Sequence, residues 1–339
     1  RLHAGKQAAL ACEPDHQGSV VRDHEREAED AIGDDLLRLL FVACHPVLPA
    51  DARVALTLRL LCGLSTAEIA RAFLLPEPTI AQRIVRAKRT LAGRGIPFEV
   101  PRRRALPQRL RSVLEVVYLV FNEGYAASHG EDWMRPALCE EALRLGRVLA
   151  ALLPASAPVL GLLALMELQA SRMGARTDAQ GAAVLLMEQD RSRWDWLQID
   201  RGQALLEKAQ ALGGGDDAYV LQAAIAACHA RARRADRTDW AGIAQLYARL
   251  ARVMPSPVVE LNRAVAVARA QGPQAAWPLL EALLQDRRLD DYAPLQAVRG
   301  DLLEHLGRRV EARSAFERAA ELSGNARERQ ALRARAADL

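Results

Sequence analysis

Residues 64–91 read LSTAEIARAFLLPEPTIAQRIVRAKRTL, and this stretch decides the fold predicted for the first third of the chain. Ser65 followed three residues later by Glu68 is a capping box, in which each residue's side chain accepts a hydrogen bond from the backbone N–H of the other. The box predicts the start of a short helix that ends near Phe73. The two prolines of LLPEP disfavour helix in the residues just before them, so a tight turn follows.

A basic amphipathic helix is predicted after this turn, over Thr79–Leu91. Its apolar residues recur at spacings of four, three and four, which places them on one face of a helix: Ile80, Ile84, Ala87 and Leu91. An apolar stripe over 51–61 predicts a further helix upstream, ended by Gly63 in a left-handed cap. A capped helix, a turn and a basic helix make a helix-turn-helix, whose second helix fits the DNA major groove. An ordinary three-helix cluster with an exposed basic face is the alternative.

Positive charge is concentrated in this part of the chain. Between Arg53 and Arg111 thirteen Lys or Arg stand against three acidic residues, a net of +10, whereas the whole chain is only +4, so the remainder is −6. A basic block inside a weakly acidic chain is the electrostatic footprint of nucleic-acid binding. We therefore predict that DNA is contacted by Ser65, Thr66, Thr79, Gln82, Arg83, Arg86, Lys88 and Arg89.

The composition of the 339 residues favours an all-α fold. Half of them are apolar but only 4% are aromatic, and chains rich in Ala and Leu pack as helices rather than sheets. The five cysteines form no CxxC pair, which argues against a zinc ribbon or a disulfide scaffold and fits a reducing cytoplasm. Cys44-His45 is interpreted as a buried turn, and Cys12 with His16 lacks the further ligands of a metal site. Glycine-rich phosphate loops are also missing from the sequence, so we expect no metal, no cofactor and no catalytic residue.

These residues resemble region four of the extracytoplasmic-function (ECF) sigma factors, which reads LSxxEIA, then a turn, then a TVxSRxxRAR-like helix. Three further motifs resemble the ECF subgroup with a long C-terminal extension related to tetratricopeptide repeats: FVACHP at 41–46, FNEGY at 121–125 and DRSRWD at 190–195. The resemblance covers nearly the whole chain. It implies a non-enzymatic, cytoplasmic transcription factor that recognises the −35 promoter element and binds core RNA polymerase at the flap of the β subunit.

The sequence departs from the family pattern in three respects. Leu74 stands where the turn usually has Gly, which is unfavourable if the backbone there requires φ > 0. Ala81 stands where the recognition helix is often basic, so base readout is expected to differ. The family's region two, which precedes the linker, is not found in the sequence. Arg1–Leu10 is the candidate for the tail of its last helix. The chain is therefore expected to be a fragment or a truncated form of a full sigma factor.

Four parts are predicted along the chain: a linker over 1–35 that includes this candidate tail, the helix-turn-helix over 36–93, a basic connector over 94–111, and a helical extension with tetratricopeptide-like repeats over 112–339. The clearest repeat is Leu295–Asn325, where small residues such as Gly300 are expected to let two helices approach and Phe316 to fill the gap between units. A weaker echo lies in 240–284. For 112–215 an irregular helical bundle is at least as plausible. Stacked repeats form a groove for protein or peptide partners.

Two polar runs are interpreted as contacts between the parts rather than as a small-molecule site; their residues are Asn122, Glu123, Tyr125, Asp190 and Arg191. Through them the extension is predicted to fold back and regulate the helix-turn-helix. The uncharged stretch Val148–Met166 contains two prolines that break a membrane span, so a helix end, a turn and a buried helix are expected. Two rivals stay open: a helical-repeat scaffold for protein interaction with a vestigial helix-turn-helix, and a small-molecule-binding regulator.

Overall fold

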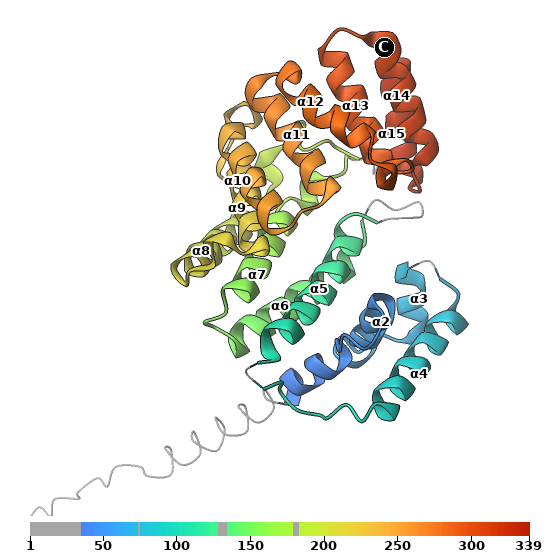
Figure 1. The fold of residues 1–339 in the computed structure, drawn as a ribbon, viewed down its shortest axis with the longest axis vertical. Coiled ribbons are helices and arrows are strands. Elements are labelled where there is room, and N and C mark those ends of the chain that lie inside the picture. Colours follow the sequence, from blue (N-terminus) through green and yellow to red (C-terminus); the bar gives the residue numbers. More distant parts are fainter. Residues whose placement is uncertain (1–34, 74, 103, 128–133, 179–182) are drawn as a thin grey trace, which may run out of the picture.

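The computed structural model describes residues 35–73, 75–102, 104–127, 134–178 and 183–339. Within these ranges the regular secondary structure is helical, with a helix-turn-helix followed by a helical extension (Figure 1), so the predicted all-α class is confirmed. The predicted linker, with the candidate tail of a region two, lies outside the described residues except at its last position, and so does Leu74.

The helix-turn-helix is built on a buried central helix. α2 (Ala50–Leu60) is surrounded by α3 (Thr66–Phe73), α4 (Glu77–Gly93) and the first helix of the extension. Seven consecutive residues of α2, numbers 52–58, are buried as a result. The predicted apolar stripe accounts for only some of the buried residues of α2, because α2 has neighbouring helices on more than one side.

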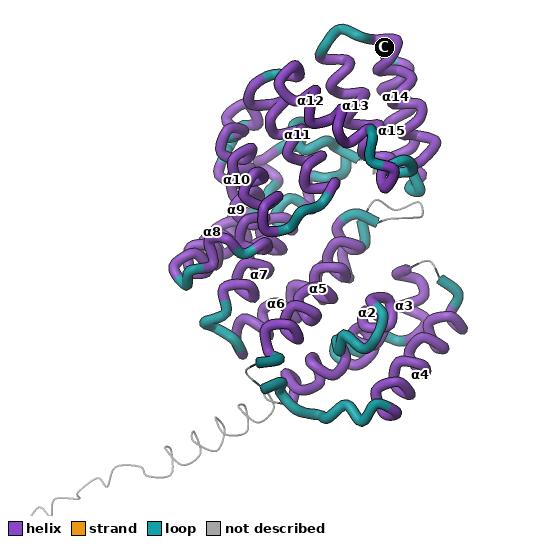
Figure 2. The backbone as a smooth tube through the Cα atoms, in the orientation of Figure 1, coloured by secondary structure: helices purple, strands orange, loops and turns teal. Residues whose placement is uncertain are grey.

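The extension continues as a series of helices that pack against their neighbours in the chain. They are α5 (Leu106–Tyr125), α6 (Pro136–Leu152), α7 (Ala157–Ala170), α8 (Trp196–Ala211), α9 (Ala218–Arg231), α10 (Trp240–Val253), α11 (Pro257–Gln271), α12 (Pro273–Leu284), α13 (Ala293–His305), α14 (Arg309–Leu322) and α15 (Ala326–Ala337). Successive helices such as α10 and α11, or α13 and α14, lie in contact. Figure 2 shows these helices stacked along the molecule and joined mostly by short loops.

The helix-turn-helix and the start of the extension share one hydrophobic core. It runs from Leu37 in the first described helical residues to Ala170 at the end of α7, and includes Ile80 of α4 and Phe121 of α5. Further along, smaller clusters form beneath the later helices. The helix-turn-helix therefore does not have a core of its own that ends before α5.

The uncharged stretch Val148–Met166 has the structure that its prolines predicted. α6 ends at Leu152, a turn carries the chain through Pro154, and α7 begins at Ala157 with almost all of its residues buried. Within the described ranges, no helix combines the length and the apolar character that crossing a membrane requires.

Small residues allow the later helices to approach closely. A Cβ atom added to Gly300 of α13 would lie 2.7 Å from the nearest ring carbon of Phe316, which belongs to α14. Gly307 ends α13 with a φ of 75°, in the left-handed region that favours glycine. The predicted roles of Gly300 and Phe316, close approach and filling of the space, are those that the structure assigns to them.

The far end of the extension returns to the end of α5. The side-chain amide of Asn325, in the turn between α14 and α15, donates a buried hydrogen bond of 3.3 Å to the carbonyl oxygen of Ala127. Figure 1 shows the α14–α15 end of the array near the C-terminal end of α5. The extension therefore curves, and its inner face borders the open cavity that is described below.

Candidate nucleic-acid interface

The first helix of the helix-turn-helix begins at the predicted capping box. The backbone N–H of Ser65 donates to Oε2 of Glu68 at 2.7 Å, and the backbone N–H of Glu68 donates to Oγ of Ser65 at 3.1 Å. The hydrogen bond from the Ser65 backbone lowers the pKa of the Glu68 carboxyl. Gly63 precedes the box with a φ of 68°, as predicted for a left-handed cap. Local hydrogen bonding thus fixes where α3 starts.

The second helix starts slightly earlier than the sequence predicted. α4 begins at Glu77 rather than Thr79, with Pro78 in its first turn, and ends at Gly93 rather than Leu91. Proline is tolerated in a first turn because the N–H group that it lacks has no partner within the helix there. The inner stripe is confirmed, since the buried residues of α4 are Ile80, Ile84, Ala87 and Leu91.

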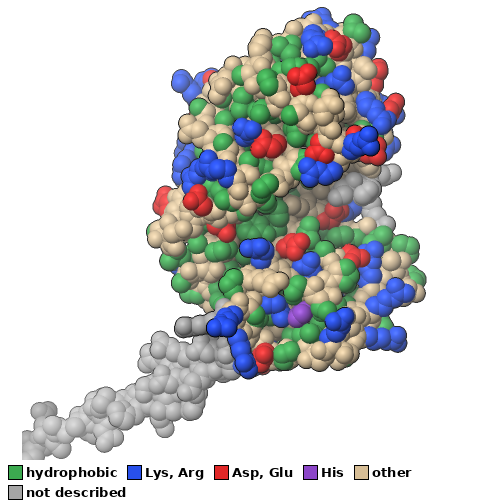
Figure 3. Space-filling view, in the orientation of Figure 1, with side chains coloured by type: hydrophobic (Ala, Val, Ile, Leu, Met, Phe, Trp, Pro, Cys, Tyr) green, Lys and Arg blue, Asp and Glu red, His purple; other side chains and the backbone are tan. Residues whose placement is uncertain are grey.

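The opposite face of α4 carries most of the predicted DNA contacts. Gln82, Arg86, Lys88 and Arg89 are exposed, and Thr79 is half-buried at the start of the helix. Within the described residues, none of the three basic side chains forms a salt bridge, so their charge remains available to an external anion. Figure 3 shows Lys and Arg side chains along this edge of the molecule, at the lower right. Ser65, which caps α3, and Thr66, the first residue of α3, are half-buried.

Arg83 lies apart from that face. Its Nε is 3.1 Å from Oδ2 of Asp51 on α2. The pair borders a groove of about 260 Å3 between α2, α3, α4 and α5, whose apolar walls include Phe73 and Leu119. Sequence reasoning missed this groove, because Leu119 lies far along the chain from the helix-turn-helix and carries no local signal of that contact.

Three arginines join the helix-turn-helix to the extension. Nη1 of Arg53, which is 9% exposed, donates to Oγ of Ser112 at 2.6 Å and to Oε2 of Glu115 at 2.9 Å. Arg109 donates to the carbonyl oxygen of Phe41 at 2.5 Å, and Arg144 donates to that of Leu61 at 2.7 Å. Two members of the predicted basic block, Arg53 and Arg109, therefore hold α2 and its neighbours against α5 and are not free to meet DNA.

The first polar run lies in the last turns of α5, between the helix-turn-helix and the rest of the extension. Asn122 lines a cavity inside the extension, whereas Glu123 borders the groove beside Arg83 and also pairs with Arg135. The ring of Tyr125 stacks on Phe121 with centroids 5.7 Å apart. The guanidinium of Arg176 lies 3.6 Å from the ring centroid of Tyr125 and forms a cation–π contact with it.

The second polar run makes its contacts within the extension. Asp190 accepts hydrogen bonds from the backbone N–H and the hydroxyl of Ser192, which lowers the pKa of its carboxyl. Arg191 is buried and donates to the carbonyl oxygens of His229 and Ala232 and to the Thr238 hydroxyl. These bonds tie the loop before α8 to the end of α9, and the structure does not bring the second run to the helix-turn-helix.

The Cys44-His45 pair lies in a buried turn, as predicted. Sγ of Cys44 is 3.3 Å from Oγ1 of Thr57, and burial raises the pKa of this thiol to about 11, which removes its nucleophilic form near neutral pH. Nδ1 of His45 accepts a hydrogen bond from the backbone N–H of Val47. Cys12 and His16 lie outside the described residues, and within those residues no group of three or more His, Cys, Asp or Glu side chains is placed to hold a metal ion.

Two family models match separate parts of the chain. Residues 38–91 match the model of sigma-70, region 4, a domain of non-enzymatic transcription factors that interact with DNA and RNA polymerase. Residues 109–210, which span α5 to α8, match a family of unknown function, DUF6596. The chain thus carries a sigma-70 region 4 domain. The capped helix α3 and the basic helix α4 are the helix-turn-helix of this domain.

One relative extends along almost the whole chain. An uncharacterized protein of Rhizobium meliloti (strain 1021) is 48% identical over 323 residues, which cover 94% of this chain and 76% of the relative. At that identity and coverage the chain belongs to the same family as this protein. No solved structure matches the chain.

Proposed function

We propose that this chain acts as a sigma factor, which binds core RNA polymerase and recognises the −35 promoter element through α4. The observation that carries the proposal is the unpaired basic face of α4 on a capped helix-turn-helix that matches sigma-70 region 4. Helix-turn-helix proteins place such a face in the major groove, with side chains near the start of the helix reaching base edges. The proposed factor has no enzymatic activity of its own and works in the cytoplasm.

The exposed side chains of α4 divide into two proposed roles. Gln82 and Arg86 lie on its first turns, where amide and guanidinium groups can form paired hydrogen bonds with adenine and guanine. Lys88 and Arg89 lie further along and would neutralise phosphates, while the hydroxyls of Ser65, Thr66 and Thr79 would donate to phosphate oxygens. Arg83 is also proposed to contact DNA, but its salt bridge with Asp51 has to break first.

Polymerase binding is proposed at the groove between the helix-turn-helix and α5. Its walls include Val54, Ile69, Phe73 and Leu119, so an apolar segment of the β flap would find a matching surface there. Fully desolvated apolar contacts of this kind supply most of the energy in protein interfaces. A flap segment seated in the groove would touch α5 as well as the helix-turn-helix.

Regulation by the extension is proposed to act through α5. The shared core and the contacts of Arg53 with Ser112 and Glu115 join α5 to α2, and α2 packs directly on α4. A shift of α5 would therefore be felt at the recognition helix. The later helix pairs, of which α13 and α14 are the clearest, are proposed to be tetratricopeptide-like repeats that offer their groove to a protein or peptide partner.

The competing proposal is a helical-repeat scaffold whose helix-turn-helix no longer binds DNA. Selection from a library of random duplexes with the full chain separates the two. The sigma-factor proposal predicts an enriched motif, and the scaffold predicts none. Changing Arg86 to Ala is expected to weaken binding of the selected duplex by about 1–3 kcal/mol and to relax specificity at one base position.

The matched control is Arg252→Met, which changes an exposed arginine on α10, far from α4 in the chain. It should leave both the affinity and the motif unchanged. An equal loss of affinity in both variants would mean that binding follows net charge rather than α4. Co-elution of the chain with core polymerase, lost on Phe73→Asp, tests the groove separately.

A further inference from the structure

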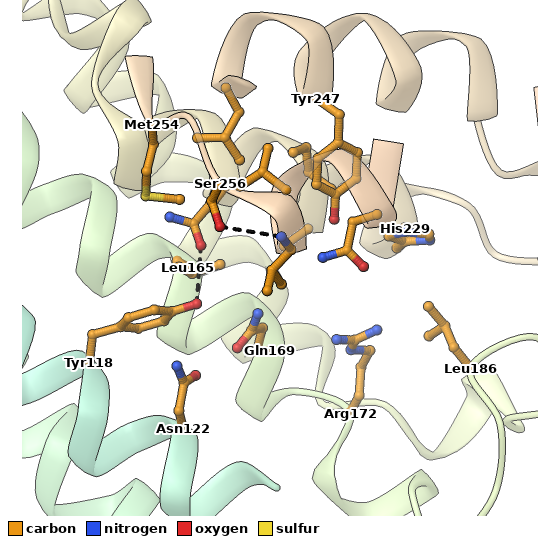
Figure 4. Close-up of a pocket in the computed structure, with 17 residues that line it drawn as sticks. Tyr118, Asn122, Leu165, Gln169, Arg172, Leu186, His229, Tyr247, Met254 and Ser256 are labelled. Atoms are coloured by element: carbon orange, nitrogen blue, oxygen red, sulfur yellow. Dashed lines mark hydrogen bonds between the residues drawn. The ribbon is translucent and has the colours of Figure 1, made fainter. Parts of the chain in front are cut away.

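The inner face of the extension contains a cavity that none of these roles uses. It has a volume of about 500 Å3 and lies between α5, α7, α9, α10 and α11. That volume falls in the range of roughly 300–1,000 Å3 that is typical of small-molecule sites. Figure 4 shows side chains from these helices, among them Tyr118, Gln169 and Tyr247, converging around a common space.

Two nitrogens beside this cavity are buried without a partner. Nε of Arg172 and Nδ1 of His229 have no hydrogen bond to any described residue, although both are shielded from solvent. Figure 4 places both side chains on the same side of the space, across from Tyr118 and Asn122. Buried polar groups nearly always have a hydrogen-bond partner, so the described residues leave Arg172 and His229 incompletely satisfied at this edge of the cavity.

The charge of the cavity favours an anion. Among the described residues that line it, Arg172 is the only one that carries a charge near neutral pH, and no carboxylate is present. Burial lowers the pKa of His229 to about 4, with Arg172 and Arg191 adding to the effect, so this imidazole is neutral and offers a hydrogen bond rather than a charge. The Arg172 guanidinium carbon lies 5.9 Å from the ring centroids of both Tyr125 and Trp194, at the distance of cation–π contacts.

Among the described residues no carboxylate forms a salt bridge with the half-buried Arg172, so its charge lacks the partner that usually compensates desolvation. A carboxylate fits best, because the planar guanidinium pairs with it through two parallel hydrogen bonds. Part of the cavity wall is apolar and is formed by Leu165 of α7, Ile225 of α9 and Val259 of α11. Gln169 and Asn262 add amide groups that can orient a ligand.

We propose that this cavity binds a small organic acid, whose carboxylate pairs with Arg172 and whose apolar body lies against Leu165, Ile225 and Val259. The site goes beyond the proposed function and does not depend on DNA binding. It also includes Asn122, one of the residues that the sequence assigned to a contact between the parts of the chain.

The probes for the test are 4-phenylbutyrate and its neutral amide, which differ only in the group that would meet Arg172. Binding of each to the full chain is measured by saturation-transfer NMR. Ligands of this size bind preformed sites with a Kd on the order of 1 mM, and loss of the charged pair should weaken the amide about tenfold.

Three variants make the result specific. Arg172→Met should remove the preference for the acid. Ala226→Phe places a ring in the cavity and should abolish binding of both probes, and it keeps the test decisive if Arg172→Met fails to fold. Arg252→Met, outside the cavity, should bind as the unaltered chain does, and circular dichroism checks that each variant is folded. Equal binding of acid and amide, a preference that survives in Arg172→Met, or no saturation transfer from the unaltered chain would overturn the proposal.

Discussion

Arg53 gives the sharpest test of how the helix-turn-helix is joined to the extension. Its guanidinium donates from α2 to Glu115 at 2.9 Å and to Ser112 at 2.6 Å, and its side chain is only 10% exposed. Changing Arg53 to Met keeps most of the apolar stem and removes both hydrogen bonds. Because Ser112 still donates to the carbonyl oxygen of Cys44 at 2.5 Å, it does not become an unpaired buried group.

The magnitude follows from these contacts. A hydrogen bond to a charged group contributes roughly 1.5–3 kcal/mol, and Glu115 is half exposed and regains water when Arg53 is removed. We therefore expect the opening free energy of α2 to fall by about 2 kcal/mol, which corresponds to amide exchange about 30-fold faster in that helix. The shared core predicts that the amides of α5 respond together with those of α2.

Hydrogen exchange resolved by peptide measures this effect on the full chain. Arg71→Met is the matched control, because Arg71 is exposed on α3 and lies outside the contacts with α5. It should leave exchange in α2 unchanged. Unaltered exchange in Arg53→Met, or acceleration confined to α2 while α5 stays protected, would refute the claim that these parts form one cooperative unit.

Three further predictions concern other elements. Changing Ser65 to Ala removes one half of the capping box and should cost about 1 kcal/mol in urea unfolding, whereas Thr66→Ala should cost less. Changing Gly300 to Ala forces a methyl group against the Phe316 ring and should destabilise the chain by about 1–3 kcal/mol in the same assay. The pKa of His229 is lowered from an ordinary 6.5 to about 4. Between pH 6.5 and 4, His229 is therefore protonated in the unfolded chain but neutral in the native chain. Stability should therefore rise from pH 4 to 6.5, and thermal unfolding of His229→Gln should depend less steeply on pH; an unchanged pH dependence would rule out this role for His229.

The sequence predicted those parts of the interface that local interactions determine. The capping box, the two prolines and the four-three-four spacing act within one or two helical turns, so α3 and the buried stripe of α4 could be placed in advance. α4 begins two residues before the predicted Thr79, because proline is tolerated in a first turn and Pro78 therefore lies inside the helix rather than in the turn before it. Close helix approach at Gly300 was predictable from a different signal, the placement of small residues around Phe316 in 295–325.

Contacts across the fold could not be found in that way. Arg53 and Arg109 contribute to the same basic block as Arg86 and Arg89, and only the packing of α5 separates structural arginines from those that face outward. The second polar run, predicted at the helix-turn-helix, instead holds α9 through Arg191. The cavity is lined from five helices, and no local spacing relates Arg172 to His229.

The salt dependence of DNA binding by the full chain tests the central claim most directly. Fluorescence anisotropy with the selected duplex, repeated from about 50 to 200 mM salt, measures how many phosphates are neutralised, because each contact steepens the log–log slope by about 0.9. A sigma factor that binds through the exposed face of α4 should show a steep slope, reduced by about one contact in Arg89→Gln and unchanged in Arg252→Met. A flat slope, or a slope equally altered by both variants, would contradict DNA recognition by α4.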